Sequence, residues 1–339
     1  MICIRADANK EIATGHIMRC AAIAEAFVEE EKEVCFVVAD GYGEDLVKKL
    51  GFHCFVLNSN YSNMEGETDV LMSLLDHNHA ELLLVDSYYV TETYFNILKD
   101  VVRIAYIDDW MGIPLSCNII INYDLSVTRE YYKEYDNDTL FLLGGSYTPL
   151  RKQFRDQQTK IVNSKVSNIL VLTGGSDHFH VVFSICNALI SDIKMFNGCV
   201  FNIVCGRYNE DYNKIIEKTK QYSLLKVHRS IDDIDMFIKR ADVCISAGGT
   251  TTKELAACGT PTLTISVADN QLEGVKSLNR LGLMKYIGDV REDSFSYKRL
   301  IYELFLLCND QERRIRESKL LQQTIDGMGA VRIARELLK

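Results

Sequence analysis

The sequence lacks the short motifs that mark several common classes of enzyme. It contains no GxxxxGK[ST] motif and no GxGxxG motif after its first apolar run, which argues against ATP hydrolysis and ordinary NAD binding. It has no CxxC pair and no HExxH, so neither a zinc site nor a dithiol redox motif is expected. Only 3 prolines occur in 339 residues, which suits a chain dominated by regular helices and strands.

Charge and hydropathy disfavour two further classes of partner. The net charge of −9 argues against a nucleic-acid partner, because phosphate backbones favour clustered lysine and arginine. No apolar stretch approaches the ~20 residues of a membrane span, and the strand-like start does not resemble a signal peptide. Several of the 11 cysteines, such as Cys35, Cys199 and Cys244, lie in apolar runs and are expected to be buried thiols. We therefore expect a cytoplasmic protein without a membrane span.

Short apolar runs alternate with helical patterns throughout the chain. Continuous apolar runs of this length indicate parallel strands that are buried on both faces, as in a doubly wound α/β sheet. The length suggests about two domains. We expect an N-terminal domain over 1–150, a polar link over 151–166, a C-terminal domain over 165–320 and a closing helix over 321–339. Strands are expected at 2–8, 34–40, 54–59, 82–87, 103–109, 117–123, 139–145, 168–175, 198–206, 243–249 and 260–268, with a further one in LLKVH.

Residues 11–22, EIATGHIMRCAA, connect the first strand to the first helix. Gly15 permits a sharp turn, and the helix that follows offers free N–H groups to an anion. His16 stands at the same place, and histidine is well suited to accept a proton near neutral pH. The sequence predicts that His16 is a catalytic base; a helix-capping or packed histidine is the alternative.

A second Gly-rich turn, SAGGTTTKE, covers 246–254. Gly248 and Gly249 would let a ligand approach the backbone, and Thr250 begins a run of hydroxyls at a helix start, which suits a diphosphate. Glu254 could accept hydrogen bonds from a ribose diol or could instead stabilise the helix dipole. Gly174 belongs to a similar turn at the end of another strand.

Polar residues gather where other strands end. Asp7, Asp86, Asp108 and Asp109 could cap helices, orient His16 or bind sugar hydroxyls, and we favour these roles over a divalent metal site. Further along, the amides of Asn270 and Gln271 could bond sugar hydroxyls or acetamido groups, or Asn270 could simply cap its helix.

Eight short motifs occur in one order: IRADAN, GHIMR, DSYY, IDD, GGSYTPLR, TGGSD, SAGGTTTKE and DNQ. Over roughly residues 1–275 this order resembles the UDP-2,4-diacetamido-2,4,6-trideoxy-β-L-altropyranose hydrolases of pseudaminic acid biosynthesis. That family is similar to glycosyltransferases of the GT-B fold, so the resemblance implies two Rossmann-like, doubly wound domains facing a cleft.

The resemblance also implies roles for residues. His16 would activate water, and Tyr88 and Asn270 would line the sugar pocket. The loop over 246–254 would hold UDP, with Glu254 at the ribose. IRADAN and TGGSD add Arg5, Gly174 and Asp177 to the expected substrate-binding residues, alongside Gly15, Gly248, Gly249, Thr250 and Gln271. The family often has Gly-x-Gly-His, whereas Ala13 stands at the first glycine here.

The expected reaction is cleavage of the anomeric C–O bond with inversion, releasing UDP and the free diacetamido sugar. No metal and no cofactor are expected, and the sequence does not fix the oligomeric state. A GT-B glycosyltransferase that uses a UDP-sugar donor is the first alternative. A non-catalytic protein that binds nucleotide sugars is the second.

Overall fold

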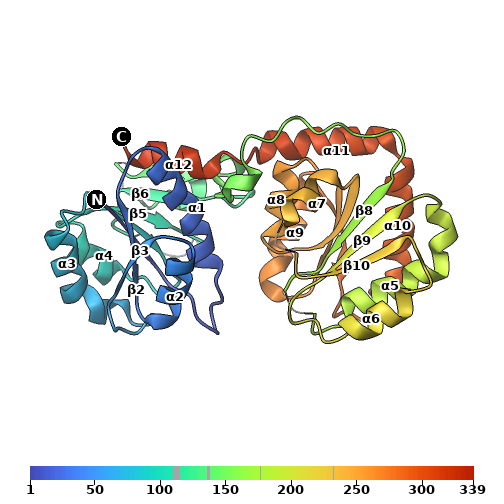
Figure 1. Cartoon of the computed structure of the whole chain (residues 1–339). Coiled ribbons are helices and arrows are strands. Elements are labelled where there is room, and N and C mark those ends of the chain that lie inside the picture. Colours follow the sequence, from blue (N-terminus) through green and yellow to red (C-terminus); the bar gives the residue numbers. More distant parts are fainter. Residues whose placement is uncertain (110–114, 136–137, 176, 232) are drawn as a thin grey trace. The chain divides into compact units, whose positions relative to one another are not determined.

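The computed structural model describes residues 1–109, 115–135, 138–175, 177–231 and 233–339. The chain forms two compact units: unit 1 comprises Met1–Arg155 and Gly327–Lys339, and unit 2 comprises Asp156–Asp326. Each unit contains one parallel β-sheet with helices around it (Figure 1). This architecture confirms the predicted doubly wound α/β class. No helix in the described ranges is long and apolar enough to cross a membrane.

Unit 1 contains a seven-stranded sheet in the order β3-β2-β1-β4-β5-β6-β7, and every neighbouring pair is parallel. The order reverses at β1, and ligands of such sheets bind beyond the carboxyl ends of the strands near this switch point. The strands are β1 (Ile2–Ala6), β2 (Val34–Val38), β3 (His53–Val56), β4 (Leu82–Asp86), β5 (Arg103–Ile107), β6 (Ile119–Asn122) and β7 (Leu140–Leu143). Its helices are α1 (Gly15–Glu29), α2 (Gly41–Lys49), α3 (Thr68–His77), α4 (Glu92–Leu98) and α12 (Gly329–Leu337), with 3-10 turns at Met64–Glu67, Arg129–Tyr132, Gly145–Tyr147 and Lys152–Phe154.

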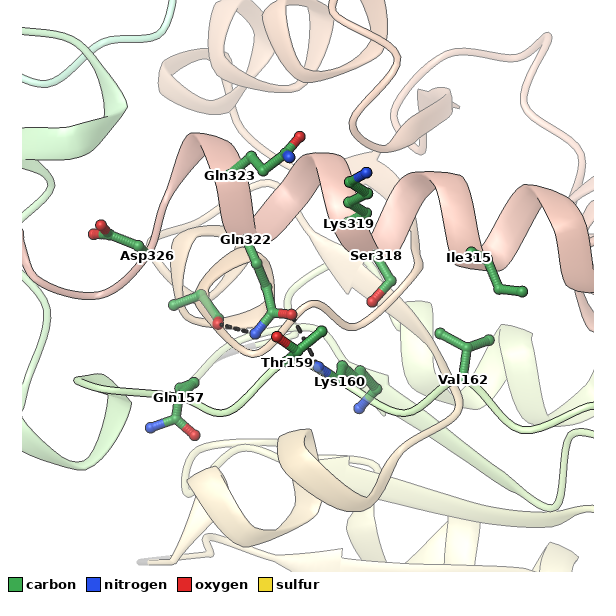
Figure 2. Close-up of a pocket in the computed structure, with 11 residues that line it drawn as sticks. Gln157, Thr159, Lys160, Val162, Ile315, Ser318, Lys319, Gln322, Gln323 and Asp326 are labelled. Carbon is green, nitrogen blue, oxygen red and sulfur yellow. Dashed lines mark hydrogen bonds between the residues drawn. The ribbon is translucent and has the colours of Figure 1, made fainter.

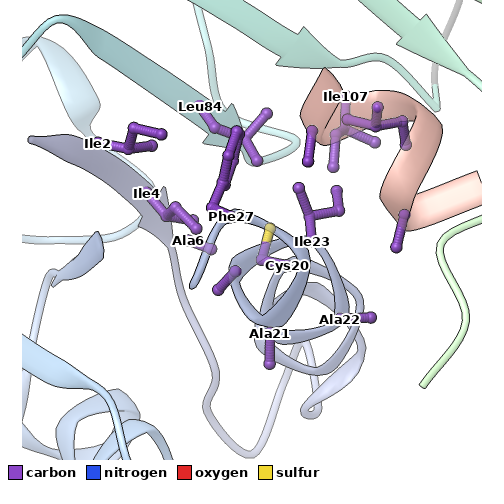
Figure 3. Packing of buried hydrophobic residues seen from close by; sticks show 14 of the residues in the cluster. Ile2, Ile4, Ala6, Cys20, Ala21, Ala22, Ile23, Phe27, Leu84 and Ile107 are labelled. Carbon is purple, nitrogen blue, oxygen red and sulfur yellow. The ribbon is translucent and has the colours of Figure 1, made fainter. Parts of the chain in front are cut away.

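Both faces of the unit 1 sheet are buried, as the continuous apolar runs predict. Ile2 and Ile4 pack on one face with residues of α1 and α12, whereas Cys3 belongs to a separate cluster on the other face. This alternation is the two-residue period of a strand. Figure 3 shows Ile23 and Phe27 of α1 against the strand side chains.

The C-terminal helix α12 belongs to the core of unit 1. Ala330 and Ile333 are buried in the same cluster as α1. Two glycines permit this close packing, because a Cβ atom on Gly327 would lie 2.1 Å from the Phe154 carbonyl oxygen and one on Gly329 would lie 2.2 Å from that of Thr148. The segment expected as a closing helix therefore divides between α11 (Gln311–Thr324) of unit 2 and α12 of unit 1.

Unit 2 contains a six-stranded parallel sheet in the order β10-β9-β8-β11-β12-β13. The strands are β8 (Asn168–Leu172), β9 (Val200–Cys205), β10 (Leu225–Arg229), β11 (Val243–Ala247), β12 (Thr262–Ser266) and β13 (Lys285–Asp289). Its helices are α5 (Val181–Asp192), α6 (Tyr212–Thr219), α7 (Ile234–Arg240), α8 (Thr251–Ala257), α9 (Asp269–Arg280), α10 (Tyr297–Asn309) and α11 (Gln311–Thr324), with a 3-10 turn at Ile193–Phe196.

Strand β13 is missing from the sequence-based expectation. Its sequence, KYIGD, lacks a continuous apolar run, and Gly288 takes a φ of +148° where the pairing with β12 shifts register. Within the expected link over 151–166, the Asn163 side chain donates to Asp242 over 2.7 Å, so the second part of that segment is bonded to unit 2.

Candidate functional site

The loop between β1 and α1 brings His16 to the carboxyl end of the unit 1 sheet. Ala13, not Gly15, adopts the left-handed backbone conformation there, with a φ of +57°. The expectation that Gly15 makes the special turn is therefore wrong; Gly15 is the first residue of α1, and a Cβ atom on it would meet nothing within 4 Å. Thr14 makes no side-chain capping bond and the first turn contains no acidic residue, so the positive end of the helix dipole carries no compensating carboxylate of its own.

His16 and Asp86 form a buried hydrogen-bonded pair. The Nδ1 atom of His16 lies 2.7 Å from Oδ1 of Asp86, at the end of β4. His16 is 4% exposed and Asp86 is 1% exposed. The structure thus selects Asp86 from the four strand-end carboxylates as the residue that orients His16.

Arg19 keeps Asp86 ionised. Burial alone would raise the pKa of this carboxyl, but the charge and hydrogen bonds of Arg19, together with those of His16, hold the pKa well below its usual range. An ionised carboxylate can only accept, so the Nδ1–H of His16 must be the donor. Arg19 Nη2 lies farther from Nδ1, at 3.1 Å, and cannot donate to a nitrogen that carries a proton. In neutral His16 the acceptor lone pair is therefore on Nε2, as a general base requires.

Two more residues complete this cluster in unit 1. The ring of Tyr88 meets the ring of His16 edge-on, with centroids 4.6 Å apart, and Tyr88 remains 45% exposed. Arg19 Nη1 donates to Asp109 over 2.7 Å. Asp108 has a different partner, the hydroxyl of Tyr132, so the two adjacent carboxylates are used separately.

Arg5 does not join this cluster. It is fully buried, and its guanidinium donates to Asp7 over 2.5 Å and to both carboxylate oxygens of Glu67 over 2.6 and 2.9 Å. Asp7 also accepts from the Ala39 backbone N–H, which joins the ends of β1 and β2. These contacts give Arg5 a structural role, and the substrate contact expected from the IRADAN motif stays a prediction.

In unit 2, the loop after β11 lies directly against the start of α9. A Cβ atom on Gly248 would lie 2.3 Å from Val275 Cγ1 and 3.1 Å from the Cβ of Gln271, so only glycine fits there without displacement. Gly249 has open space around its α-carbon, and Thr250 precedes α8. Thr252 donates its hydroxyl hydrogen to the Gly249 carbonyl over 2.8 Å, which fixes the turn. Glu254 is buried in the first turn of α8.

The same packing brings Gln271 beside this loop, and Asn270 precedes it on α9. Asn270 is exposed and is the second residue of α9; the residue that caps this helix is Ala268, so the alternative of a capping Asn270 is wrong. The Oε1 atom of Gln271 accepts from the Val267 N–H over 3.0 Å, which orients the side chain toward the end of β12.

The TGGSD turn is organised around Asp177. Its carboxylate accepts from the backbone N–H groups of Val181 and Val182 over 2.7 and 2.9 Å and from Asn209 over 3.0 Å, so it occupies the start of α5. Gly174 has a φ of +99°, and its carbonyl would lie 2.4 Å from a Cβ atom on Gly206. The Asp177 side chain therefore caps the start of α5, and its expected contact with the substrate stays a prediction. Ser176 of this motif lies outside the described residues.

A cavity of about 640 Å³ lies elsewhere in unit 2, between α11 and the segment before β8 (Figure 2). It lies beside Ala257, at the opposite end of α8 from Thr250. Two of its polar side chains bond within the fold: Lys160 Nζ donates to the Thr260 hydroxyl over 3.1 Å, and Gln322 Nε2 donates to the Ala257 carbonyl over 3.2 Å. Within the described ranges, no group of three or more His, Cys, Asp or Glu could hold a metal ion.

Sequence reasoning missed Arg19. Its signal was the spacing in GHIMR, which puts His16 and Arg19 on one face of a helix at positions i and i+3. The pairing with Asp86, 67 positions away, becomes visible only when β4 lies beside β1.

The sequence of unit 2 matches the model of the glycosyltransferase family 28 C-terminal domain over residues 168–324. The chain is 26% identical over 349 residues to the spore coat polysaccharide biosynthesis protein SpsG of Bacillus subtilis, covering 97% of the chain and 95% of SpsG. It is 23% identical over 289 residues to the uncharacterized protein MJ1062 of Methanocaldococcus jannaschii, covering 80% of the chain and 57% of MJ1062.

A third relative is the Helicobacter pylori protein named pseudaminic acid cytidylyltransferase and UDP-2,4-diacetamido-2,4,6-trideoxy-β-L-altropyranose hydrolase. It is 24% identical over 210 residues, which cover 60% of the chain and 37% of that protein. The chain thus spans little more than half of MJ1062 and about a third of the Helicobacter protein. Among solved structures, Acinetobacter baumannii MurG is similar with a TM-score of 0.71 at 12% identity, covering 99% of both chains. The chain therefore has the GT-B fold, as the resemblance implied.

Proposed function

We propose that this protein is a UDP-sugar hydrolase that inverts the anomeric configuration and needs no metal ion. His16 of unit 1 accepts a proton from water through Nε2, and the water attacks the anomeric carbon from the face opposite UDP. The observation that carries the proposal is the His16–Asp86 hydrogen bond of 2.7 Å, which fixes the tautomer that a base requires. Asp86 does not take the proton; it orients the imidazole and stabilises the imidazolium that forms.

UDP is the leaving group in this proposal and stays on unit 2. Gly248, Gly249 and Thr250 offer backbone N–H groups to the diphosphate, and Glu254 accepts from the ribose diol. UDP is a good leaving group, so fixed N–H donors can stabilise its developing charge without a general acid. The match of unit 2 to a glycosyltransferase domain supports a nucleotide-binding role for this unit.

The sugar is the finer part of the proposal. The resemblance in motifs and the similarity to the Helicobacter protein support a UDP-diacetamido-trideoxy sugar as substrate, and hence a role in pseudaminic, or nonulosonic, acid biosynthesis. Tyr88 offers an apolar ring face to the sugar, and Asn270 and Gln271 offer amides to its acetamido groups.

A glycosyltransferase is the second candidate, because MurG and the rhamnosyltransferase SpnG are structural neighbours that cover 99% and 100% of the chain. In that case an acceptor hydroxyl replaces water as the nucleophile that His16 deprotonates. The two candidates differ in one observable: a hydrolase releases free sugar without any acceptor.

The deciding experiment incubates the purified protein with a panel of UDP-sugars and follows UDP release and anomeric configuration by NMR. We expect free sugar of inverted configuration from a diacetamido-trideoxy donor, with the same rate in EDTA. UDP release only after an acceptor is added would favour the transferase. Binding without turnover would favour a non-catalytic protein, and complete loss of turnover in EDTA, restored by magnesium, would overturn metal independence.

A further inference from the structure

Arg19 contacts more of the unit 1 cluster than any function assigned so far explains. It lies one helical turn after His16 on α1. Its Nε and Nη2 atoms donate to the two carboxylate oxygens of Asp86, each over 2.5 Å. Its Nη1 atom donates to Asp109 over 2.7 Å and to the Tyr123 hydroxyl over 2.6 Å. One side chain of α1 thus connects the ends of β4, β5 and β6.

Tyr88 lies near Asp109, the second carboxylate that accepts from Arg19. Burial raises the pKa of Tyr88, and the nearby negative charge of Asp109 raises it further. The ring of Tyr88 lies edge-on to the ring of His16, 4.6 Å between centroids. Hydrogen bonds therefore join His16, Asp86, Arg19 and Asp109 in one cluster, and Tyr88 lies against His16 and close to the charge of Asp109.

We propose that Arg19 is a positioning residue that sets the base through Asp86 and the sugar-binding ring of Tyr88 through Asp109. The inference rests on the proposed function, because it presumes that His16 and Tyr88 act on the substrate. It adds one point to that function: the orientation of the base and the orientation of the sugar are controlled by the same guanidinium.

The chemistry of arginine explains why this residue type is needed. A guanidinium is planar and presents several N–H donors in fixed directions, so it can hold two carboxylates at once in a defined geometry. A lysine ammonium would keep the positive charge but could not reproduce the paired hydrogen bonds to Asp86. The charge is enclosed as well, because the Arg19 side chain is 15% exposed and Asp86 is 1% exposed.

Several titratable and charged groups in the described part of the chain surround Asp86. The titratable and charged groups that face it come from α1, the loop after β4, and the strands β5 and β6 with their following loops. They are His16, Arg19, Cys20, Tyr88, Tyr106, Asp109 and Tyr123. Arg19 is the arginine of this set, so its removal leaves Asp86 and Asp109 without their shared cation.

The test compares Arg19→Met and Arg19→Lys with Arg335→Met as a matched control, since Arg335 forms an exposed ion pair with Glu30 on the same unit. We expect Arg19→Met to lower kcat by about 100-fold and to raise KM. Arg19→Lys should have a higher kcat than Arg19→Met but a lower one than wild type. Lysine keeps the positive charge beside Asp86 but cannot make the paired hydrogen bonds of the guanidinium. The control should match wild type in kcat, KM and Tm.

Asp109→Asn separates the effect of Arg19 on Tyr88 from its effect on Asp86. It removes the negative charge near Tyr88 and one carboxylate partner of Arg19, but it leaves the paired hydrogen bonds from Arg19 to Asp86 in place. We therefore expect KM for the UDP-sugar to rise about 3- to 10-fold while kcat stays within about 3-fold of wild type. In the double variant Arg19→Met/Asp109→Asn, KM should be no higher than in Arg19→Met alone, because Arg19→Met has already removed the hydrogen bond between Arg19 and Asp109. A residue that only stabilises the fold would lower Tm and the active fraction without this split between kcat and KM.

His16→Asn distinguishes failure of the inference from failure of the proposed function. The positioning role is overturned if Arg19→Lys is folded with wild-type kcat and KM and Asp109→Asn has wild-type KM. If His16→Asn is inactive in the same experiment, the proposed function still stands. A fully active His16→Asn overturns the proposed function itself. If Arg19→Met fails to fold, Arg19→Lys and Asp109→Asn decide the question.

Discussion

The two units present different kinds of chemistry at the carboxyl ends of their sheets. Unit 1 presents ionisable side chains that are bonded to one another: His16, Asp86, Arg19 and Asp109. The corresponding loop of unit 2 presents Gly248 and Gly249, whose value is access to the backbone. Proton transfer requires a side chain of fixed orientation, whereas a diphosphate requires N–H groups that a ligand can approach. In the proposed function, the same sheet architecture thus carries a base in one unit and an anion-binding loop in the other.

The largest expected effect comes from removing the base in unit 1. His16→Asn should lower kcat by about 10²- to 10⁴-fold, the usual contribution of a general base. Turnover of the UDP-sugar and Tm, measured on one preparation, separate a catalytic histidine from a structural one. A folded variant with kcat near that of wild type would remove His16 from the mechanism. The assignment of the base to unit 1 would then be wrong.

A somewhat smaller effect is expected from Asp86→Asn. The amide can donate to Nδ1, which would place the imidazole proton on Nε2 and remove the acceptor that the water needs. We expect kcat to fall by about 10²-fold, with KM changed little. The kinetics should be compared with those of Asp40→Asn, which alters the capping side chain of α2. Equal kinetics in the two variants would argue against an orienting role for Asp86.

A charge in unit 2 is expected to affect stability and not catalysis. Hydrogen bonds from Arg291 and the positive charge of its guanidinium lower the pKa of Asp289 to about 2. Burial of the carboxyl acts in the opposite direction but is the weaker effect. Because the pKa is depressed in the folded state, the carboxylate stabilises the fold above its usual pKa of about 4, and this is lost as the pH falls toward 2.

Urea unfolding should therefore show Asp289→Asn less stable than wild type by about 1–2 kcal/mol near neutral pH, with the gap closing by about pH 2. Its kcat should equal that of wild type. A gap that widens on acidification would mean that the sign of the shift is wrong. A loss of kcat would place a catalytic carboxylate in unit 2.

The smallest effect is expected at Ala13, where unit 1 contains backbone strain. A left-handed φ of +57° is unfavourable for alanine, so Ala13→Gly should raise the free energy of unfolding by about 0.5–1 kcal/mol. Gly51→Ala is the matched opposite, since Gly51 has a φ of +86° and open space around its α-carbon. Thermal unfolding should shift upward for the first variant and downward for the second. A decrease in Tm for Ala13→Gly would mean that the strain is absent.

The sequence predicted the parallel sheets because their strands are continuous apolar runs buried on both faces. It missed β13, whose short sequence contains a glycine and a lysine in place of an apolar run. It also did not predict that α12 packs in unit 1, because that packing depends on the close backbone approach at Gly327 and Gly329. A pattern read along the chain contains no information on such contacts.

For the candidate site, the sequence pointed to the strand ends but not to the pairings there. Asp86 was one of four possible partners for His16, and only the three-dimensional arrangement selects it. Arg5 and Asp177 lie in motifs of the resembled family, yet their donors and acceptors are used within the fold. Motifs locate residues that matter without separating those that support a site from those that contact a substrate.

The central claim is that the base belongs to unit 1 and the nucleotide to unit 2. Calorimetric titration of UDP into wild type, His16→Asn and Gly248→Ala tests it most directly, with Gly274→Ala as control because its Cβ would meet nothing within 4 Å. We predict that His16→Asn and Gly274→Ala bind UDP within about 2-fold of wild type, whereas Gly248→Ala binds at least about 10-fold more weakly, since its Cβ must displace Val275. Wild-type UDP affinity in Gly248→Ala, together with lost affinity in His16→Asn, would contradict the account.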